Sequence, residues 1–273
     1  MSSSTDAATG GNGSALLPAS NGPDLTDDAF LGGRLRLNQP ARGHRAGHDA
    51  MLLAAAAPGD ARRAVDLGAG VGAAGLALAV RVPAVSVSLV EIDPVIAAIA
   101  AGNARRQGLE ARVEVVVADV ATLARPGGPP APAARSADLV VMNPPFNDPA
   151  RHRTSPDAVR AGAHMAPDEA VDVWIRAAER LLEPAGRLVL IHRPEALAAL
   201  LAALDRRFGA VTIRPVHARP DAAAIRLLVG AVKGRRTPPA VLPPLVLADA
   251  EGRQSAAAAR ILRDGEAISG GNA

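Results

Sequence analysis

The chain has 273 residues, no cysteine and a net charge of only +3, so disulfides and cysteine-ligated metal sites are excluded. Residues 1–33 contain four acidic residues and no lysine or arginine, which argues against a secretory signal or a transit peptide. No uncharged apolar stretch reaches the about 18 residues that a membrane span needs, so we expect a cytoplasmic protein.

The composition divides the chain into four segments. Residues 1–25 are rich in Ser, Gly, Ala and Asn and are predicted to form a disordered tail. A lead-in segment, 26–60, precedes a long stretch, 61–236, in which apolar runs alternate with Ala- and Leu-rich runs. A Pro-rich C-terminal extension covers 237–273. The main domain is therefore expected in residues 61–236.

Predicted strands and helices alternate along that domain. Strands are predicted at 64–67, 85–90, 113–117, 139–142, 188–191, 211–216 and 225–232, and helices at 73–80, 94–107, 167–182 and 194–208, with a short one at 254–262. This order indicates βαβ units, and so a mostly parallel seven-stranded α/β sheet with helices on both faces. The last two strands have no helix between them, so one of them should run antiparallel.

Two basic clusters stand out against the nearly neutral total charge. Residues 34–48 contain four arginines, two histidines and no acid. Residues 214–236 contain five arginines and Lys233 against Asp221. Such clusters suit a phosphate-rich partner. A general bias toward arginine, with ordinary solvated faces, explains them equally well.

A glycine-rich turn follows the first strand of the domain. Residues 66–75 read DLGAGVGAAG, so Gly68, Gly70 and Gly72 lie between a strand and a helix. Glycine there allows a sharp turn and a close approach to a ligand. The second half of the turn fits the dinucleotide fingerprint G-x-G-x-x-G, and Glu91 lies 19 residues past Gly72, where a ribose-binding acid belongs. NAD is therefore one candidate ligand.

Acidic residues at the ends of three successive strands favour S-adenosylmethionine instead. Asp66 precedes the glycines, where a carboxylate would repel a pyrophosphate but attract a cation. Glu91 and Asp93 follow the second strand, and Asp119, with Val120 beside it, follows the third. S-adenosylmethionine has an amino-acid tail and a ribose but no phosphate. The glycines would face its tail, Glu91 its ribose hydroxyls and Asp119 its adenine amine, at the strand ends where open α/β sheets bind ligands.

The fourth strand stops at Asn143-Pro144-Pro145-Phe146. The prolines fix the backbone, so the Asn143 side-chain oxygen and the Pro144 carbonyl are held in place. Together with the Phe146 ring, they can accept two hydrogen bonds from a planar NH2 group and stack on the ring that bears it. We expect these four residues to be catalytic, with Asn143 also bordering the cofactor. The structural alternative is a strand-ending turn with a core Phe.

Taken in order, these motifs resemble those of the Rossmann-like class I methyltransferases that modify exocyclic amines. Residues 45–53 (RAGHDAMLL) are similar to the lead-in segment of the bacterial tRNA(Val) adenine N6-methyltransferases, which methylate an adenine beside the anticodon. The resemblance extends from about Asp28 to the C-terminal helix. Phe146 stands where that family often has Tyr, and Arg45 where it often has Lys. Both differences keep the aromatic ring or the charge.

The resemblance implies an S-adenosylmethionine-dependent N6-methyltransferase of adenine, with tRNA as partner and no bound metal. The expected substrate-binding residues are Arg45 and Asp49 in the lead-in segment, and Arg151 and Arg153 in the connection after the tetrapeptide. No membrane association is expected. The chain is expected to be a monomer or a weak dimer.

Other functions share parts of this pattern. Protein glutamine N5-methyltransferases carry a helical substrate domain before the glycine-rich strand, whereas here the lead-in segment has only 35 residues (26–60). Guanine N2-methyltransferases of rRNA often carry a second, degenerate domain. An NAD(P)-binding oxidoreductase would leave residues 143–146 unexplained. An inactive RNA-binding module would leave the intact motifs without a purpose.

Overall fold

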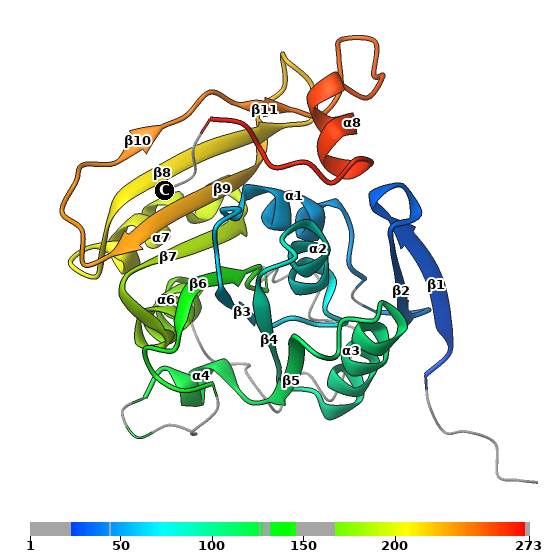
Figure 1. Cartoon of the computed structure of the whole chain (residues 1–273). Coiled ribbons are helices and arrows are strands. Elements are labelled where there is room, and N and C mark those ends of the chain that lie inside the picture. The colour runs from blue at the N-terminus through cyan, green and yellow to red at the C-terminus, as the bar shows by residue number, and fades with distance from the viewer. Residues whose placement is uncertain (1–22, 44, 126, 128–131, 146–166, 271–273) are drawn as a thin grey trace, which may run out of the picture.

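A single nine-stranded sheet forms the middle layer of the protein (Figure 1). The computed structural model describes residues 23–43, 45–125, 127, 132–145 and 167–270. The strands lie in the order β10-β8-β9-β7-β6-β3-β4-β5, with β11 also paired to β8. All neighbours are parallel except β9, which runs antiparallel to both β7 and β8. The mostly parallel α/β sheet and the antiparallel partner among the last two expected strands are thus confirmed.

The seven expected strands all form. They are β3 (Arg63–Leu67), β4 (Ser86–Glu91), β5 (Val113–Val117), β6 (Ala137–Met142), β7 (Leu182–His192), β8 (Phe208–His217) and β9 (Ala224–Lys233). The expected count was too low by two, because β10 (Ala240–Val241) and β11 (Leu245–Val246) of the C-terminal extension add to the edge at β8. A two-residue strand shows no alternation that a sequence pattern could detect.

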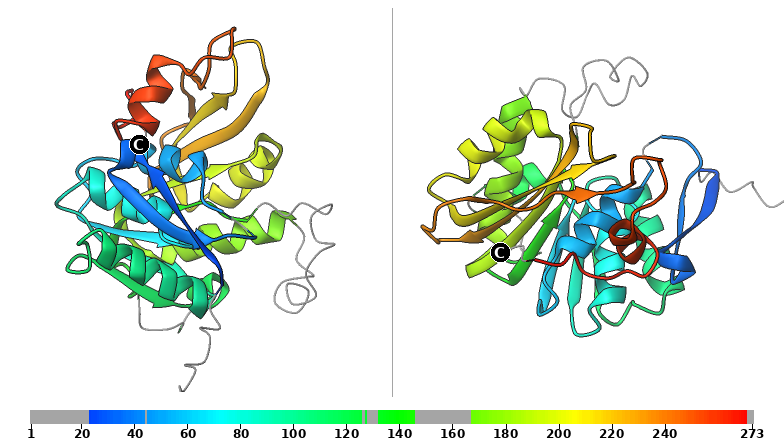
Figure 2. Two further views of the ribbon diagram at one scale, coloured as in Figure 1. Left: turned by 90° about the vertical axis from the view of Figure 1, so that its right-hand side faces the viewer. Right: turned by 90° about the horizontal axis from the view of Figure 1, so that it is seen from above.

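Helices cover both faces of the sheet, as Figure 2 shows. One core cluster joins the sheet to α1 (His48–Ala56), α2 (Ala73–Arg81) and α3 (Pro94–Arg106), and α8 (Ala256–Leu262) packs on α1. The other core cluster joins it to α4 (Val120–Leu123), α6 (Pro167–Leu181) and α7 (Leu197–Leu204). Short 3-10 turns lie at η1 (Leu31–Gly33) and η2 (Pro194–Ala196). Within the described residues, none of these helices has the length and apolarity to cross a membrane.

The lead-in segment contains a β-hairpin that the sequence pattern did not predict. Strands β1 (Leu25–Phe30) and β2 (Leu35–Pro40) pair antiparallel as a separate two-stranded sheet. β1 begins at Leu25, inside the segment predicted to be a tail, and residues 1–22 of that segment lie outside the described part of the chain. The adjacent acids Asp27 and Asp28 made β1 hard to predict from the sequence, since carboxylates are rare in strands.

Arginines from other positions neutralise these acids. The Asp27 carboxylate accepts hydrogen bonds from Arg106 at 2.6 Å and Arg36 at 2.7 Å, which lower its pKa to about 2. The side chains of Leu35 and Leu37, on the opposite strand, are fully buried. The hairpin is therefore stabilised by contacts with the domain rather than by its own strand propensity.

Asn103 of α3 connects this hairpin to the glycine-rich turn. Its Oδ1 accepts the Asn38 N–H of β2 at 2.8 Å, and its Nδ2 donates to the carbonyls of Asn38 and Val71, each at 3.0 Å. The residue is completely buried. A buried amide with partners on two other segments holds both in fixed positions relative to α3.

Replacing Asn103 should destabilise the fold. In Asn103→Ala, one N–H and two carbonyls lose their partner, so we expect the free energy of unfolding to fall by roughly 2–4 kcal/mol in urea titrations. Gln107→Ala is the matched control, because its amide makes one exposed bond to the Arg36 carbonyl at 2.9 Å. That variant should lose less than about 1 kcal/mol. Equal losses in the two variants would contradict the connecting role of Asn103.

Candidate active site

The carboxyl ends of four neighbouring parallel strands meet at one edge of the sheet. In β3, Leu67 pairs with Val90 of β4 on one side and with Met142 of β6 on the other, and Glu91 of β4 pairs with Val117 of β5. These paired strand ends therefore lead directly into the glycine-rich turn after β3, the acids after β4 and β5, and the tetrapeptide after β6. The structure brings the sequence-predicted residues to the edge where open α/β sheets bind ligands.

Glu91 holds the glycine-rich turn against the end of β4. Its Oε2 accepts the Gly70 N–H at 2.9 Å, and its Oε1 accepts the Asp93 N–H at 3.0 Å. Each carboxylate oxygen has a second acceptor position, which a ribose hydroxyl can use. Gly70 has a φ of +57°, and a Cβ placed there would meet no atom within 4 Å, so the turn is open on that side.

Asp66 lies inside the turn rather than on its surface. The residue is 2% exposed, and its Oδ2 accepts the Gly75 N–H at 2.8 Å. Burial raises the pKa of Asp66 to about 7, the Gly75 hydrogen bond opposes this rise, and the nearby Glu91 carboxylate adds to it. Asp66 thus connects the end of β3 to the first turn of α2. Its expected contact with the cofactor stays a prediction.

The acids after β4 and β5 begin helices. Asp93 caps α3, since its Oδ1 accepts the Val95 N–H at 2.8 Å. Asp119 caps α4 in the same way through the Ala121 N–H, also at 2.8 Å, and Val120 is the first residue of that helix. Capping uses one oxygen of each carboxylate, so the other oxygen remains for a ligand.

Two apolar residues beside these acids are exposed, and the sequence reasoning missed them. Ile92 stands between Glu91 and Asp93 and is 55% exposed, while Val117 at the end of β5 is 56% exposed. Exposed aliphatic groups at a ligand-binding edge can pack on the faces of a planar base. For Ile92, the sequence offered one signal, namely an apolar residue between the two acids Glu91 and Asp93.

Trp174 of α6 covers the glycine-rich turn. A Cβ at Gly68, which has a φ of +67°, would lie 2.3 Å from the Trp174 Cη2, so only glycine fits beneath the indole. Trp174 also packs against the core cluster below α6. Its second contact, with Gly68, holds the glycine-rich turn against α6.

Asn143 presents a buried acceptor that has no partner. The Asn143 Oδ1 is inaccessible to solvent and makes no hydrogen bond within the described residues. Pro144 is buried and Pro145 is exposed, while Phe146 lies outside the described part of the chain. A buried acceptor without a donor costs about 1–3 kcal/mol, so a site that keeps one points to a ligand that supplies the N–H.

The predicted substrate-binding residues in the lead-in segment have partners of their own. Arg45 donates to Asp28 at 2.6 Å, and Asp49, in the first turn of α1, accepts from Arg226 of β9 at 2.7 Å. Part of the basic cluster at 34–48 therefore neutralises acids of the hairpin. Arg151 and Arg153 lie outside the described residues. RNA binding by these side chains stays a prediction.

Comparison with known proteins identifies a family and several relatives of this chain. The family model described as the methyltransferase small domain matches residues 47–217, a range that contains the site from Asp66 to Asn143. The tRNA1(Val) (adenine(37)-N6)-methyltransferase of Porphyromonas gingivalis is 32% identical over 202 residues, 71% of this chain and 74% of the relative. The protein of the same name from Aeromonas hydrophila is 32% identical over 70% of this chain and 77% of the relative.

A solved structure shares the fold over nearly the whole described chain. A crystal structure described as a predicted O-methyltransferase from Agrobacterium tumefaciens is 31% identical, with a TM-score of 0.66. The similarity covers 82% of this chain and 100% of that one. The central sheet and the helices on its faces are therefore shared with a protein described as a methyltransferase.

The buried Asp66 predicts a specific dependence of stability on pH. Its pKa is about 7 in the folded protein against 3.8 in the unfolded chain, so the folded state holds a proton that the unfolded state releases between these values. The contribution of Asp66 to the free energy of unfolding therefore falls as pH rises from 4 to 7. The total fall is about 1.4 kcal/mol for each unit by which the folded and unfolded pKa values differ. Asp66→Asn has no such proton.

Urea unfolding of both proteins between pH 4.5 and 7.5 tests this expectation. The free energy of unfolding of Asp66→Asn, relative to the unsubstituted protein, should increase steadily across that range. Comparing the two proteins at each pH cancels the titration of all other carboxylates. A difference that stays constant with pH would show that Asp66 is ionised in the folded protein.

Proposed function

The chain belongs to the methyltransferase small-domain family and is an S-adenosylmethionine-dependent methyltransferase, and we propose that it methylates the exocyclic N6 amine of an adenine in tRNA. The observation that carries this proposal is the buried Asn143 oxygen at the end of β6, which has no partner among the described residues and is followed by two prolines. The names of the relatives, which specify adenine 37 of tRNA1(Val), support the same substrate class. Family membership sets aside the NAD(P) oxidoreductase interpretation.

The residues at the edge of the sheet fit S-adenosylmethionine. Glu91 and Asp93 would hold its ribose, and the turn of Gly68, Gly70 and Gly72 would face its amino-acid tail. The fit rests on the free acceptor positions of the Glu91 carboxylate and on the open side of Gly70. When bound, the cofactor supplies a methyl group on a positively charged sulfur.

Four further residues would surround the adenine of the cofactor. Asp119, at the start of α4, keeps one carboxylate oxygen for the adenine amine, with Val120 beside it. Ile92 and Val117 offer exposed aliphatic surface close to Glu91 and Asp119 in the chain. A polar edge contact combined with apolar faces is the usual way in which proteins bind a planar base.

Asn143 and Pro144 would orient the amine that receives the methyl group. The lone pair of an adenine amine is delocalised into the ring, so the nitrogen is a weak nucleophile. Hydrogen bonds from its two N–H groups to the Asn143 Oδ1 and the Pro144 carbonyl would favour a pyramidal nitrogen with a localised lone pair. Positioning is then the main catalytic contribution of the protein. Once methylated, the nitrogen is acidic enough to release its proton to water.

The remaining substrate contacts belong to the same proposal. Phe146 would stack on the target base, which has to leave any helical stack to reach Asn143. Arg45, Arg151 and Arg153 would contact RNA phosphates. The ion pair between Asp49 and Arg226 would hold α1 beside the sheet edge. A tRNA substrate is consistent with a cytoplasmic enzyme, and the monomeric or weakly dimeric state stays a prediction.

Methyl-labelled S-adenosylmethionine tests the proposal directly. The protein is incubated separately with total RNA and with total protein, and labelled products are digested and identified. We expect N6-methyladenosine in the tRNA fraction. Label in protein would indicate that the substrate is a protein glutamine, and N2-methylguanosine in rRNA would indicate that it is an rRNA guanine.

The same assay with Asn143→Ala tests the role of the amide. We expect methyl transfer to fall at least about 100-fold, because positioning of the amine is lost. Affinity for S-adenosylmethionine should stay nearly unchanged. Gln254→Ala removes an exposed amide from the C-terminal extension and should leave both quantities intact. If Asn143→Ala lost cofactor affinity and activity together, Asn143 would have a structural role.

A further inference from the structure

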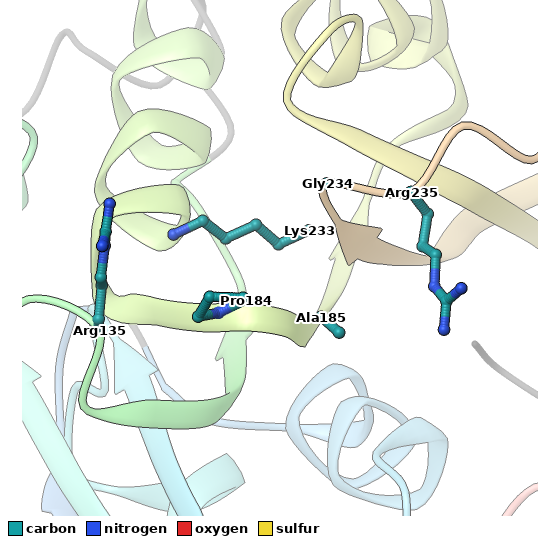
Figure 3. Close-up of a pocket in the computed structure, with 6 residues that line it drawn as sticks. All are labelled: Arg135, Pro184, Ala185, Lys233, Gly234 and Arg235. Atoms are coloured by element: carbon teal, nitrogen blue, oxygen red, sulfur yellow. The ribbon is translucent and has the colours of Figure 1, made fainter.

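A cavity of about 390 Å³ opens at the edge of the sheet opposite to the glycine-rich turn (Figure 3). Arg135, just before β6, lines it together with the turn Pro184-Ala185 of β7 and the end of β9. Strand β6 runs from this edge toward Asn143 over six residues, or about 20 Å. The cavity is thus separate from the site of methyl transfer.

Three cationic residues line this cavity: Arg135, Lys233 and Arg235. In Figure 3, the Lys233 side chain extends toward the Arg135 side chain, while Arg235 lies on the far side and extends away from both. The Lys233 ammonium donates to the carbonyls of Glu179 at 2.5 Å and Leu182 at 2.6 Å, at the end of α6. These bonds use two of its three N–H groups. The pKa of Lys233 is lowered by burial and by the Arg135 charge, while Glu179 opposes this.

The nearest acids are occupied by other arginines. Glu179 pairs with Arg207 at 3.2 Å, and Glu183 pairs with Arg63 at 2.6 Å. Within the part of the chain that the structure describes, the Arg135 side chain makes no ion pair or hydrogen bond. Two cations at short range repel each other, and an anion between them would remove that repulsion.

The backbone around the cavity is held in an unusual conformation. Arg135 has a φ of +57° and Ala185 a φ of +62°. Residues with side chains rarely adopt this left-handed region, and such strain gathers where a ligand or a function requires it. The Arg135 N–H donates to the Arg180 carbonyl at 3.0 Å, which fixes the strained residue to α6.

We propose that this cavity binds a phosphate group, with the Arg135 guanidinium donating to two of its oxygens and the Lys233 ammonium to a third. A guanidinium matches the geometry of phosphate with two parallel N–H groups, and an ammonium adds a point charge. Arg235 lies at the rim and strengthens the positive potential there. The phosphate comes either from a small phosphorylated molecule or from an RNA backbone, and only the RNA source rests on the proposed function.

Inorganic phosphate is the first probe. We expect calorimetric titration of the full chain, at constant ionic strength maintained with chloride, to detect phosphate binding. Arg135→Gln should weaken that binding at least tenfold, whereas Arg135→Lys, which keeps the charge, should weaken it less. Arg236→Gln is the matched control, because Arg236 is exposed and adjacent but does not line the cavity. Its affinity for phosphate should equal that of the unsubstituted protein.

RNA is the second probe and separates the two sources. If inorganic phosphate does not bind, the cavity can still bind a phosphate of the RNA backbone. In that case Arg135→Gln should weaken tRNA binding, whereas Arg236→Gln should not. A backbone source also requires that the slope of log affinity against log salt falls by about 0.7–0.9, the value for one phosphate contact. If Arg135→Gln and Arg236→Gln behave alike with both probes, the cavity is not a phosphate site. Phosphate binding without RNA methylation would instead contradict the proposed function and support the phosphate site.

Discussion

The site depends on one carboxylate, Glu91, which joins two turns that are far apart in the sequence. By accepting the N–H groups of Gly70 and Asp93, it fixes the glycine-rich turn after β3 relative to the start of α3. The glycines and the helix cap therefore keep constant positions at the sheet edge. A ligand whose hydroxyls also bind Glu91 would meet a surface that is already in place, which lowers the entropy cost of binding.

Packing supports the same turn from its other sides. Trp174 covers Gly68, and the buried Asn103 amide bonds the Val71 carbonyl while holding strand β2. Asp66 completes the arrangement by accepting the Gly75 N–H. The lead-in hairpin, the helix α6 and the sheet thus all contribute to one rigid turn. Through Asn103, the hairpin outside the central sheet is thus connected to the glycine-rich turn.

The sequence predicted the features that follow from local pattern. Seven strands, their mainly parallel order and the position of Glu91, Asp119 and Asn143 at strand ends all follow from apolar runs bounded by turn residues. The hairpin at β1 and β2 escaped because Asp27 and Asp28 are neutralised by arginines that only the fold brings near. The burial of Asp66 and the contact of Trp174 with Gly68 likewise depend on long-range packing that no local pattern contains.

The central role of Glu91 is tested most directly by the affinity of Glu91→Gln for S-adenosylmethionine. The amide NH2 cannot accept, so one of the two backbone N–H groups loses its partner and the turn loses its fixed position. We predict that cofactor affinity falls at least about tenfold, the loss of one charged hydrogen bond. Glu114→Gln, at an exposed carboxylate bonded to Ser88, should leave it unchanged. Equal affinities for Glu91→Gln and the unsubstituted protein would contradict the central role of Glu91.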